Sequence, residues 1–99
     1  MELQKVERSE NEREDDRYII KDGSVMASAV DVLTKMSSNK QVILRAKGYL
    51  IPNAVAIANI VTENMLKGNS SIQNIKLDSV ISEEDGQMIS NIEIILIKN

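Results

Sequence analysis

Basic side chains without acidic neighbours occupy the middle of this 99-residue chain. Residues 32–62 contain no aspartate or glutamate, yet they hold four basic residues: Lys35, Lys40, Arg45 and Lys47. Lysine and arginine bind phosphate oxygens, and each such contact adds sequence-independent affinity for nucleic acid. The spacing therefore indicates a surface for a phosphate-bearing polymer, with Arg45 and Lys47 as its leading candidates. A solvated sheet face is the competing interpretation, above all for Lys40.

The residue types that most enzymes need are missing. The chain has no histidine and no cysteine, which removes the commonest general base, the commonest metal ligand and any thiolate site. It also has no glycine-rich phosphate loop. The acidic run Glu83-Glu84-Asp85 would bind a cation weakly, but three acids at a turn are usually just solvated. We expect no enzymatic activity, no cofactor and no metal.

The acidity of the chain is concentrated at its N-terminus. The first 17 residues hold seven acidic and four basic residues, a net charge of −3, while the remaining 82 residues hold eight of each. We predict that residues 1–16 form an acidic disordered tail and that residues 17–99 form a single domain. The tail is either a solubilising arm or an internal mimic that competes with nucleic acid for the basic surface.

The sequence predicts a cytoplasmic protein. No apolar run approaches the ~20 residues that cross a bilayer, and the polar, acidic N-terminus does not resemble a signal peptide. The absence of cysteine fits a reducing compartment. We therefore expect no membrane partner.

Three elements are predicted before the basic turn: a strand over 17–21, an amphipathic helix over 25–37 and a strand over 41–47. Asp22-Gly23 marks a turn, and Ser24 can cap the helix. Alternation in strand 41–47 divides its side chains between a core face and an outer face: Val42, Leu44 and Ala46 against Gln41, Ile43, Arg45 and Lys47.

A second helix is predicted to begin near Pro52 and to end near Leu66, before the stop signal Lys67-Gly68-Asn69. Its apolar surface is wider than one side of a small sheet requires, which favours burial against a second chain. A wide core-facing stripe in a monomer is the alternative. The candidate dimer interface consists of Val55, Ala58, Ile60, Val61 and Met65.

The C-terminal third is predicted to be a long β-hairpin with strands over 72–83 and 87–98 and a projecting tip at Asp85-Gly86. The apolar end of the last strand is typical of a central strand that is covered on both faces. The fold class is then α/β, a two-layer α+β arrangement in the order β-α-β-α-β-β. Its four-stranded mixed sheet carries both helices on one face.

The segment VILRAKGYLIPNAVAIANIV, residues 42–61, resembles the strand–turn–helix segment of the Alba family. These are small chromatin and RNA-binding proteins of archaea, with relatives in eukaryotes. The similarity extends over about residues 17–98. It is carried by Arg45, Ala46, Lys47, Gly48, Ile51, Ala54 and Val55, with support from Val25-Met26, Asp85-Gly86 and Ile92-Glu93-Ile94.

The resemblance implies a fold like the C-terminal domain of a bacterial translation initiation factor. It also implies a homodimer, or a heterodimer with a paralogue, joined through the second helix and the last strands. Such a dimer would bind double-stranded DNA or structured RNA with little sequence preference, in the cytoplasm or, for an archaeal source, at the nucleoid. The loop after the first strand, the turn after the second strand and the hairpin arm would touch the nucleic acid.

The family pattern, carried over residue by residue, and the basic patch around it together give eight candidate nucleic-acid-binding residues: Lys21, Lys40, Arg45, Lys47, Gly48, Tyr49, Asn53 and Gln87. Lys40 comes from the patch and not from the family pattern. Tyr49 and Asn53 replace basic residues, Gln87 replaces an arginine, and Asp22-Gly23 stands where the family has a basic pair. We therefore expect binding weaker than in typical members. Tyr49 as an interface or core-rim aromatic, and Lys21 as a solvated lysine, are the competing interpretations.

Two functions follow from this pattern. The first is a sequence-nonspecific DNA- or RNA-binding dimer that packages chromatin or RNA. The second is an interaction subunit that forms a heterodimer with a more basic paralogue and modulates the paralogue's binding to nucleic acid.

Overall fold

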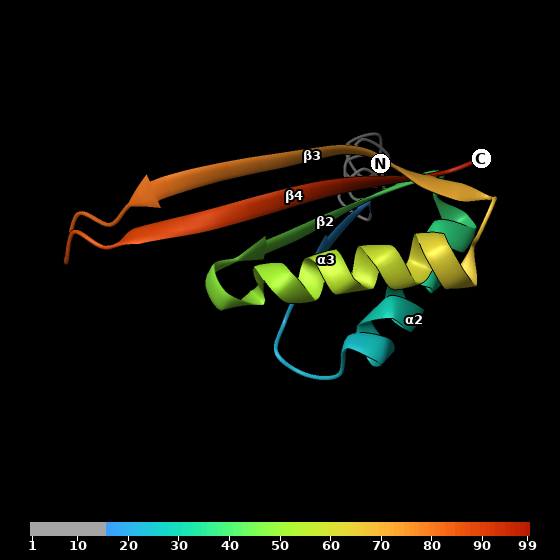
Figure 1. Ribbon diagram of the computed structural model, residues 1–99, viewed down its shortest axis with the longest axis horizontal. Helices are drawn as coiled ribbons and strands as arrows, with labels where there is room; N and C mark the ends of the chain where they lie inside the picture. The colour runs from blue at the N-terminus through green and yellow to red at the C-terminus, as the bar shows by residue number, and fades with distance from the viewer. Residues whose placement is uncertain (1–15) are drawn as a thin grey trace, which may run out of the picture.

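The computed structural model describes residues 16–99, which form a four-stranded sheet with both helices on one face (Figure 1). The elements are β1 (Arg17–Ile19), α2 (Val25–Ser38), β2 (Gln41–Lys47), α3 (Ile51–Ile60), β3 (Ser70–Ile81) and β4 (Met88–Lys98). The strand order is β1-β2-β4-β3, with β1 parallel to β2 and the other neighbours antiparallel. The predicted fold class and element order are confirmed. The predicted tail lies outside the described residues except for Asp16.

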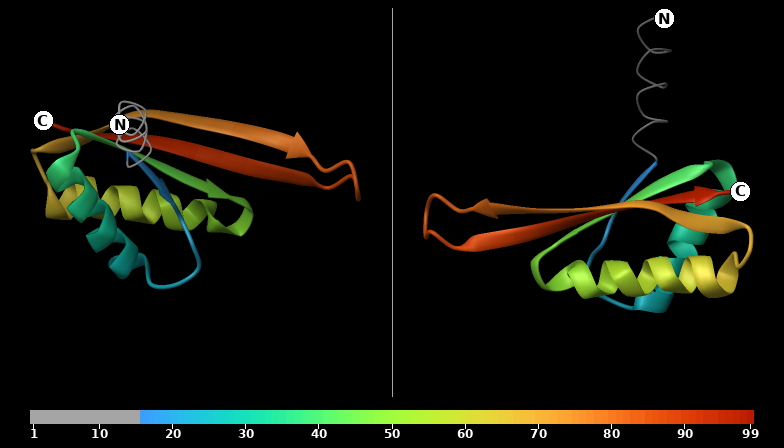
Figure 2. Two further views of the ribbon diagram at one scale, coloured as in Figure 1. Left: turned by 180° about the vertical axis from the view of Figure 1, so that it is seen from behind. Right: turned by 45° about the horizontal axis from the view of Figure 1, so that its top comes forward.

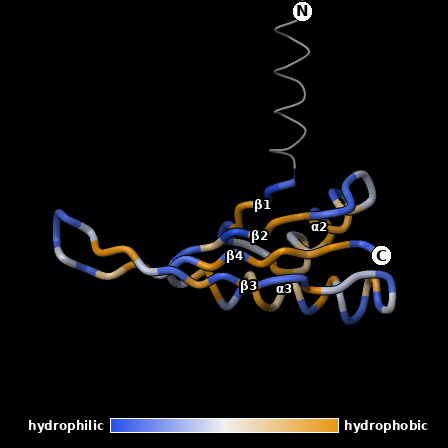
Figure 3. Tube along the Cα trace, turned by 90° about the horizontal axis from the view of Figure 1, so that it is seen from above, coloured by the Kyte–Doolittle hydropathy of each residue, from blue (hydrophilic) through white to orange (hydrophobic). Residues whose placement is uncertain are grey.

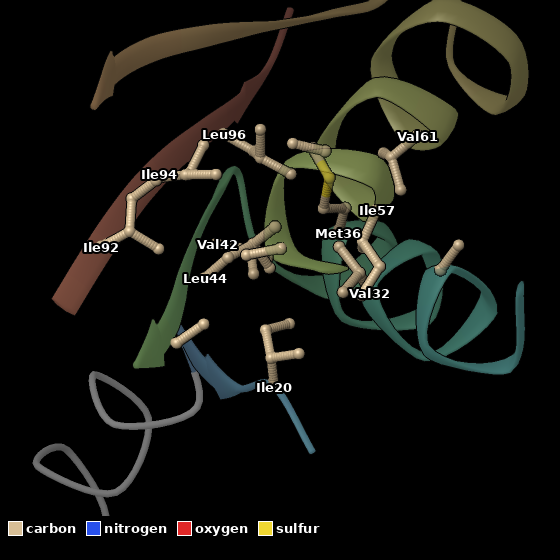
Figure 4. Packing of buried hydrophobic residues seen from close by; sticks show 14 residues of the cluster. Ile20, Val32, Met36, Val42, Leu44, Ile57, Val61, Ile92, Ile94 and Leu96 are labelled. Atoms are coloured by element: carbon tan, nitrogen blue, oxygen red, sulfur yellow. The ribbon is translucent and has the colours of Figure 1, made fainter. Parts of the chain in front are cut away.

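The core is aliphatic and lies between the sheet and the helices (Figure 4). The strand residues Val42, Leu44, Ile94 and Leu96 are at most 1% exposed. For Val42 and Leu44, this is the burial that the alternation in β2 predicts. The helices contribute the buried residues Ala29, Val32, Met36, Ala54, Ile57, Ala58 and Val61. No aromatic ring belongs to the buried core of the described residues.

The ends of the helices follow from local chemistry. The Ser24 hydroxyl accepts a hydrogen bond from the Ala27 amide at 3.1 Å, which confirms the predicted N-cap of α2. After Ile60 the helix continues as a π-helical turn, Val61–Met65, in which the Leu66 amide donates to the Val61 carbonyl. The sequence predicted the end of this helix near Leu66 but not the change in hydrogen bonding.

The central position of β4 is confirmed, but its outer face is less covered than we predicted. Ile92, Ile94 and Leu96 are buried under the helices, whereas Ile95 and Ile97 on the other face are half-buried. Both helices lie on the same side of the sheet, so nothing in the described chain covers the second face (Figure 2).

The β3–β4 hairpin extends beyond the rest of the sheet as an arm (Figures 1 and 2). β2 pairs with β4 as far as Asn91, and β3 and β4 then continue as an isolated ladder to the pair Ile81–Met88. A register shift between Ile72 and Asn74 inserts Gln73 as an extra residue in β3. In the described part of the chain, no helix is long and apolar enough to span a membrane.

Candidate nucleic-acid interface

Four of the predicted nucleic-acid residues meet where β2 turns into α3. Lys47 is the exposed last residue of β2, and Gly48 turns the chain with a left-handed φ of 62°. Tyr49 follows with 74% of its surface exposed, and Asn53 lies half-buried in the first turn of α3. Only glycine adopts this φ without strain, so Gly48 is required by the backbone. Residues from a strand and a helix are thereby presented at the base of the arm.

A hydrogen bond joins this turn to the loop that follows β1. The Tyr49 hydroxyl donates to the Asp22 carboxylate at 2.5 Å. The bond raises the pKa of Tyr49 above its usual 10.0, because ionisation would place a second negative charge beside Asp22. β1 runs parallel to β2, so the loop after β1 lies at the same end of the sheet as the turn after β2. Lys21 lies in this loop, next to Asp22, and is exposed.

Arg45 lies on the outer face of the sheet, as predicted, but it is not a free cation. Its Nε lies 3.3 Å from an Oε atom of Glu93, its partner in the antiparallel ladder between β2 and β4. The two side chains are 50% and 30% exposed, so the pair lies at the surface. This pair was not predicted, because the register that places the two residues opposite each other is not apparent from the sequence alone.

A groove of about 480 Å³ opens beside this ion pair. Lys76 of β3 also lines the groove. It was not among the predicted residues, because its outward orientation depends on the register shift at Gln73. The polar lining consists of Arg45, Lys47, Lys76, Asp78, Asn91 and Glu93. Three cations and two carboxylates give the groove a small positive charge.

Lys40 does not join this group. It precedes β2, seven residues from Lys47, which corresponds to about 23 Å along an extended strand. Its carbonyl accepts a hydrogen bond from the amide of Lys98 at 2.8 Å, at the end of the sheet away from the arm. A ligand at the base of the arm would have to extend along the whole sheet to reach it.

Gln87 lies at the tip of the arm among acidic residues. Its carbonyl accepts from the Ser82 amide at 2.7 Å, and its own amide donates to the Asp85 carboxylate at 3.1 Å. The bond from the Gln87 amide is the largest cause that lowers the pKa of Asp85. Glu83 and Glu84 are exposed beside it, and no group of residues within 16–99 is arranged to hold a metal ion.

The five predicted interface residues of α3 and the following turn divide into two sets. Ala58 and Val61 are 1% and 0% exposed, so they pack in the chain's own core and leave a partner almost no surface to contact. Val55 is 41% exposed, and Ile60 and Met65 are half-buried. These three remain available to a second chain.

A larger apolar surface lies on β3. α3 packs on β2 and β4, and the helix-side residues of β3 stay exposed. Apolar residues also extend along the arm in the hydropathy-coloured trace (Figure 3). Ile75 and Leu77 on the helix-side face of β3 are 51% and 70% exposed. Ile81 and Met88 continue the face into the arm, with exposures of 63% and 67%. No residue of β3 was among the five predicted interface residues.

Comparison with known proteins places this chain in a family. A family model described as Alba matches residues 16–79, which is more than half of the chain. The fold is similar to Alba from Thermoplasma volcanium, with 25% identity and a TM-score of 0.71 over 82% of this chain and 98% of that one. ALBA1 from Trypanosoma brucei shares the fold at 16% identity, with a TM-score of 0.70 over 85% of this chain and 69% of that one. The predicted resemblance is confirmed, and the chain belongs to the Alba family.

Proposed function

We propose that this protein binds double-stranded DNA or structured RNA with little sequence preference and without catalysing a reaction. Membership of the Alba family, a family of nucleic-acid-binding proteins, supports this function. The observation that carries it is the hydrogen bond between Tyr49 and Asp22, because it brings the Lys21 loop and the Lys47–Gly48 turn to one end of the sheet.

The groups at this end suit a phosphate backbone. Lys21 and Lys47 supply positive charge, and the Asn53 amide can donate to a phosphate oxygen. The exposed ring of Tyr49 can stack on a base or a sugar. Contacts of this kind fix position and affinity but carry no sequence information, so we expect little discrimination between sequences.

We further propose that the protein acts as a dimer. Apolar residues of both β3 and α3 are exposed: Ile75 and Leu77 of β3 by 51% and 70%, and Val55 of α3 by 41%. Exposed apolar patches of this kind mark interaction sites in soluble proteins. A two-fold dimer would duplicate the basic residues and so double the number of phosphate contacts.

Replacing Lys47 with alanine tests the binding site. We expect weaker binding to duplex DNA and to a structured RNA, and a salt dependence of log K against log[KCl] that is shallower by about 0.9 per lost contact. Lys67→Ala is the matched control, because it removes the same charge from an exposed position after the π-helical turn. Fluorescence anisotropy across a salt series measures both the affinity and the salt slope of each variant. Equal effects of the two substitutions would show that net charge, and not this site, determines binding.

The second candidate function is a subunit that modulates a more basic paralogue. The observation in its favour is that Arg45 and Tyr49 are both bound to carboxylates, while the tip of the arm is acidic. A protein that forms normal dimers by light scattering but binds neither duplex DNA nor structured RNA at low salt would support this function over the first.

A further inference from the structure

A row of alternating charges crosses the outer face of the sheet. Arg45 of β2 is directly opposite Glu93 of β4, and Glu93 is in turn directly opposite Lys76 of β3. Side chains opposite each other in a sheet lie on the same face with Cβ atoms about 5 Å apart. Glu93 therefore stands between two cations, and all three line the groove at the base of the arm.

The ion pair in this row can exchange its partner. Arg45 and Glu93 are 3.3 Å apart at the nearest atoms, but half of the Arg45 side chain and nearly a third of the Glu93 side chain are exposed. Exposed pairs of this kind are weak because water and salt compete with them. A guanidinium binds carboxylate and phosphate oxygens with the same donor geometry, and both acceptors carry a single negative charge in this setting.

We propose that the Glu93 carboxylate occupies a phosphate position of the nucleic-acid interface, so that binding requires Arg45 to exchange this carboxylate for a phosphate oxygen of the ligand. The proposal rests on the proposed function and adds to it a residue that limits affinity from within the fold. Lys76, on the other side of Glu93, is a second cation that lines the same groove.

This arrangement has a specific effect on salt dependence. When a phosphate replaces Glu93 beside Arg45, the nucleic acid releases a condensed counterion, but the freed Glu93 carboxylate attracts a cation from solution, so the net release is small. Counterion release produces the salt dependence of binding, so Arg45 contributes less to the slope than a free arginine would. A role of Glu93 confined to holding the strands together would not alter the slope in this way.

The test compares Glu93→Gln with Glu63→Gln, since both remove one negative charge and Glu63 is exposed in the π-helical turn, away from the groove. With a duplex DNA probe, Glu93→Gln should tighten binding about two- to fivefold, the range expected for releasing an exposed ion pair. It should also steepen the salt slope by about 0.9. Glu63→Gln should leave the slope unchanged. Thermal denaturation verifies that both variants are folded.

A double variant tests whether the effect passes through Arg45. In an Arg45→Ala background, Glu93→Gln should lose most of its gain in affinity. The full gain in that background, or equal effects of Glu93→Gln and Glu63→Gln, would overturn the inference. If the wild-type protein binds and Lys47→Ala weakens binding while Glu93→Gln has no effect, the inference alone fails. If neither the wild-type protein nor Glu93→Gln binds either nucleic acid, the proposed function fails with it.

Discussion

Both tyrosines of the chain donate a hydrogen bond to an aspartate. Tyr18 donates to Asp31 at 3.0 Å, and Tyr49 donates to Asp22 at 2.5 Å. The pKa of each tyrosine is raised, mainly by partial burial for Tyr18 and mainly by the hydrogen bond for Tyr49. The ionisation of Tyr49 therefore reports on the contact that joins the two loops of the site.

Asp22→Asn should lower the pKa of Tyr49 toward 10.0 and leave Tyr18 unchanged. Because the pKa of Tyr49 is raised in the folded state, the contribution of this bond to stability is complete below pH 10. It is lost as the pH rises through the raised value. Titration of tyrosinate absorbance in the ultraviolet measures both residues, and Asp31→Asn serves as the converse control. An unchanged titration in Asp22→Asn would mean that the bond does not form in solution.

For individual residues, the sequence predicted which side chains point outward but not which side chains they contact. Arg45 and Lys47 share the outer face of β2, as alternation required. The carboxylate that binds Arg45 lies 48 positions further along the chain, and only the pairing of β2 with β4 brings the two together. That register cannot be derived from residue types and local spacing.

The turn between β2 and α3 is the element that assembles the site, and Gly48 is the residue on which its shape depends. With φ at 62°, an L side chain is strained even though space around the Cα is open. The conformation directs Tyr49 toward the Asp22 loop and begins the helix that carries Asn53.

Gly48→Ala should destabilise the domain by about 1 kcal/mol. For a domain of this size, that corresponds to a fall in Tm of about 4–8 °C. Gly48→Asn should lose less stability than Gly48→Ala, because asparagine tolerates the left-handed region better than alanine. Differential scanning calorimetry of the three proteins gives the comparison. Equal stability of the alanine variant and the wild type would show that the turn relaxes to another conformation.

The helices and strands were predictable because their apolar residues recur with clear periods, and capping residues mark their ends. Two features were not predictable from such periods. The π-helical turn depends on the Thr62 hydroxyl and the Leu66 amide, which bond to the carbonyls of Ala58 and Val61. The extra residue in β3 interrupts the alternation without any glycine or proline to indicate it.

For the molecule as a whole, the position of α3 decides which surface is free. α3 packs on β2 and β4, and the helix side of β3 stays exposed, where a second copy of the chain would supply the missing cover. The proposed dimer depends on this face.

Leu77→Asp should shift the protein from dimer to monomer, because it places a charge in the middle of the proposed interface. Val80→Asp is the control: Val80 lies on the same strand, is 55% exposed and points to the other face. Light scattering coupled to size-exclusion chromatography gives the molar mass of each variant. A monomeric wild-type protein, or a Leu77→Asp variant that remains dimeric, would contradict the proposed interface.

The extra residue at Gln73 determines which side chains of β3 lie on each face of the sheet. Beyond it, Ile75 and Leu77 lie on the helix side, and Lys76 and Asp78 lie on the groove side. Without it, the two sets would trade places, because neighbouring side chains in a strand point in opposite directions. The length of β3 upstream of Ile75 is thus under tighter constraint than the identity of its residues. Insertion or deletion of one residue there would put charged side chains on the apolar face and apolar side chains in the groove. It would therefore disrupt both surfaces together, whereas a point substitution alters only one of them.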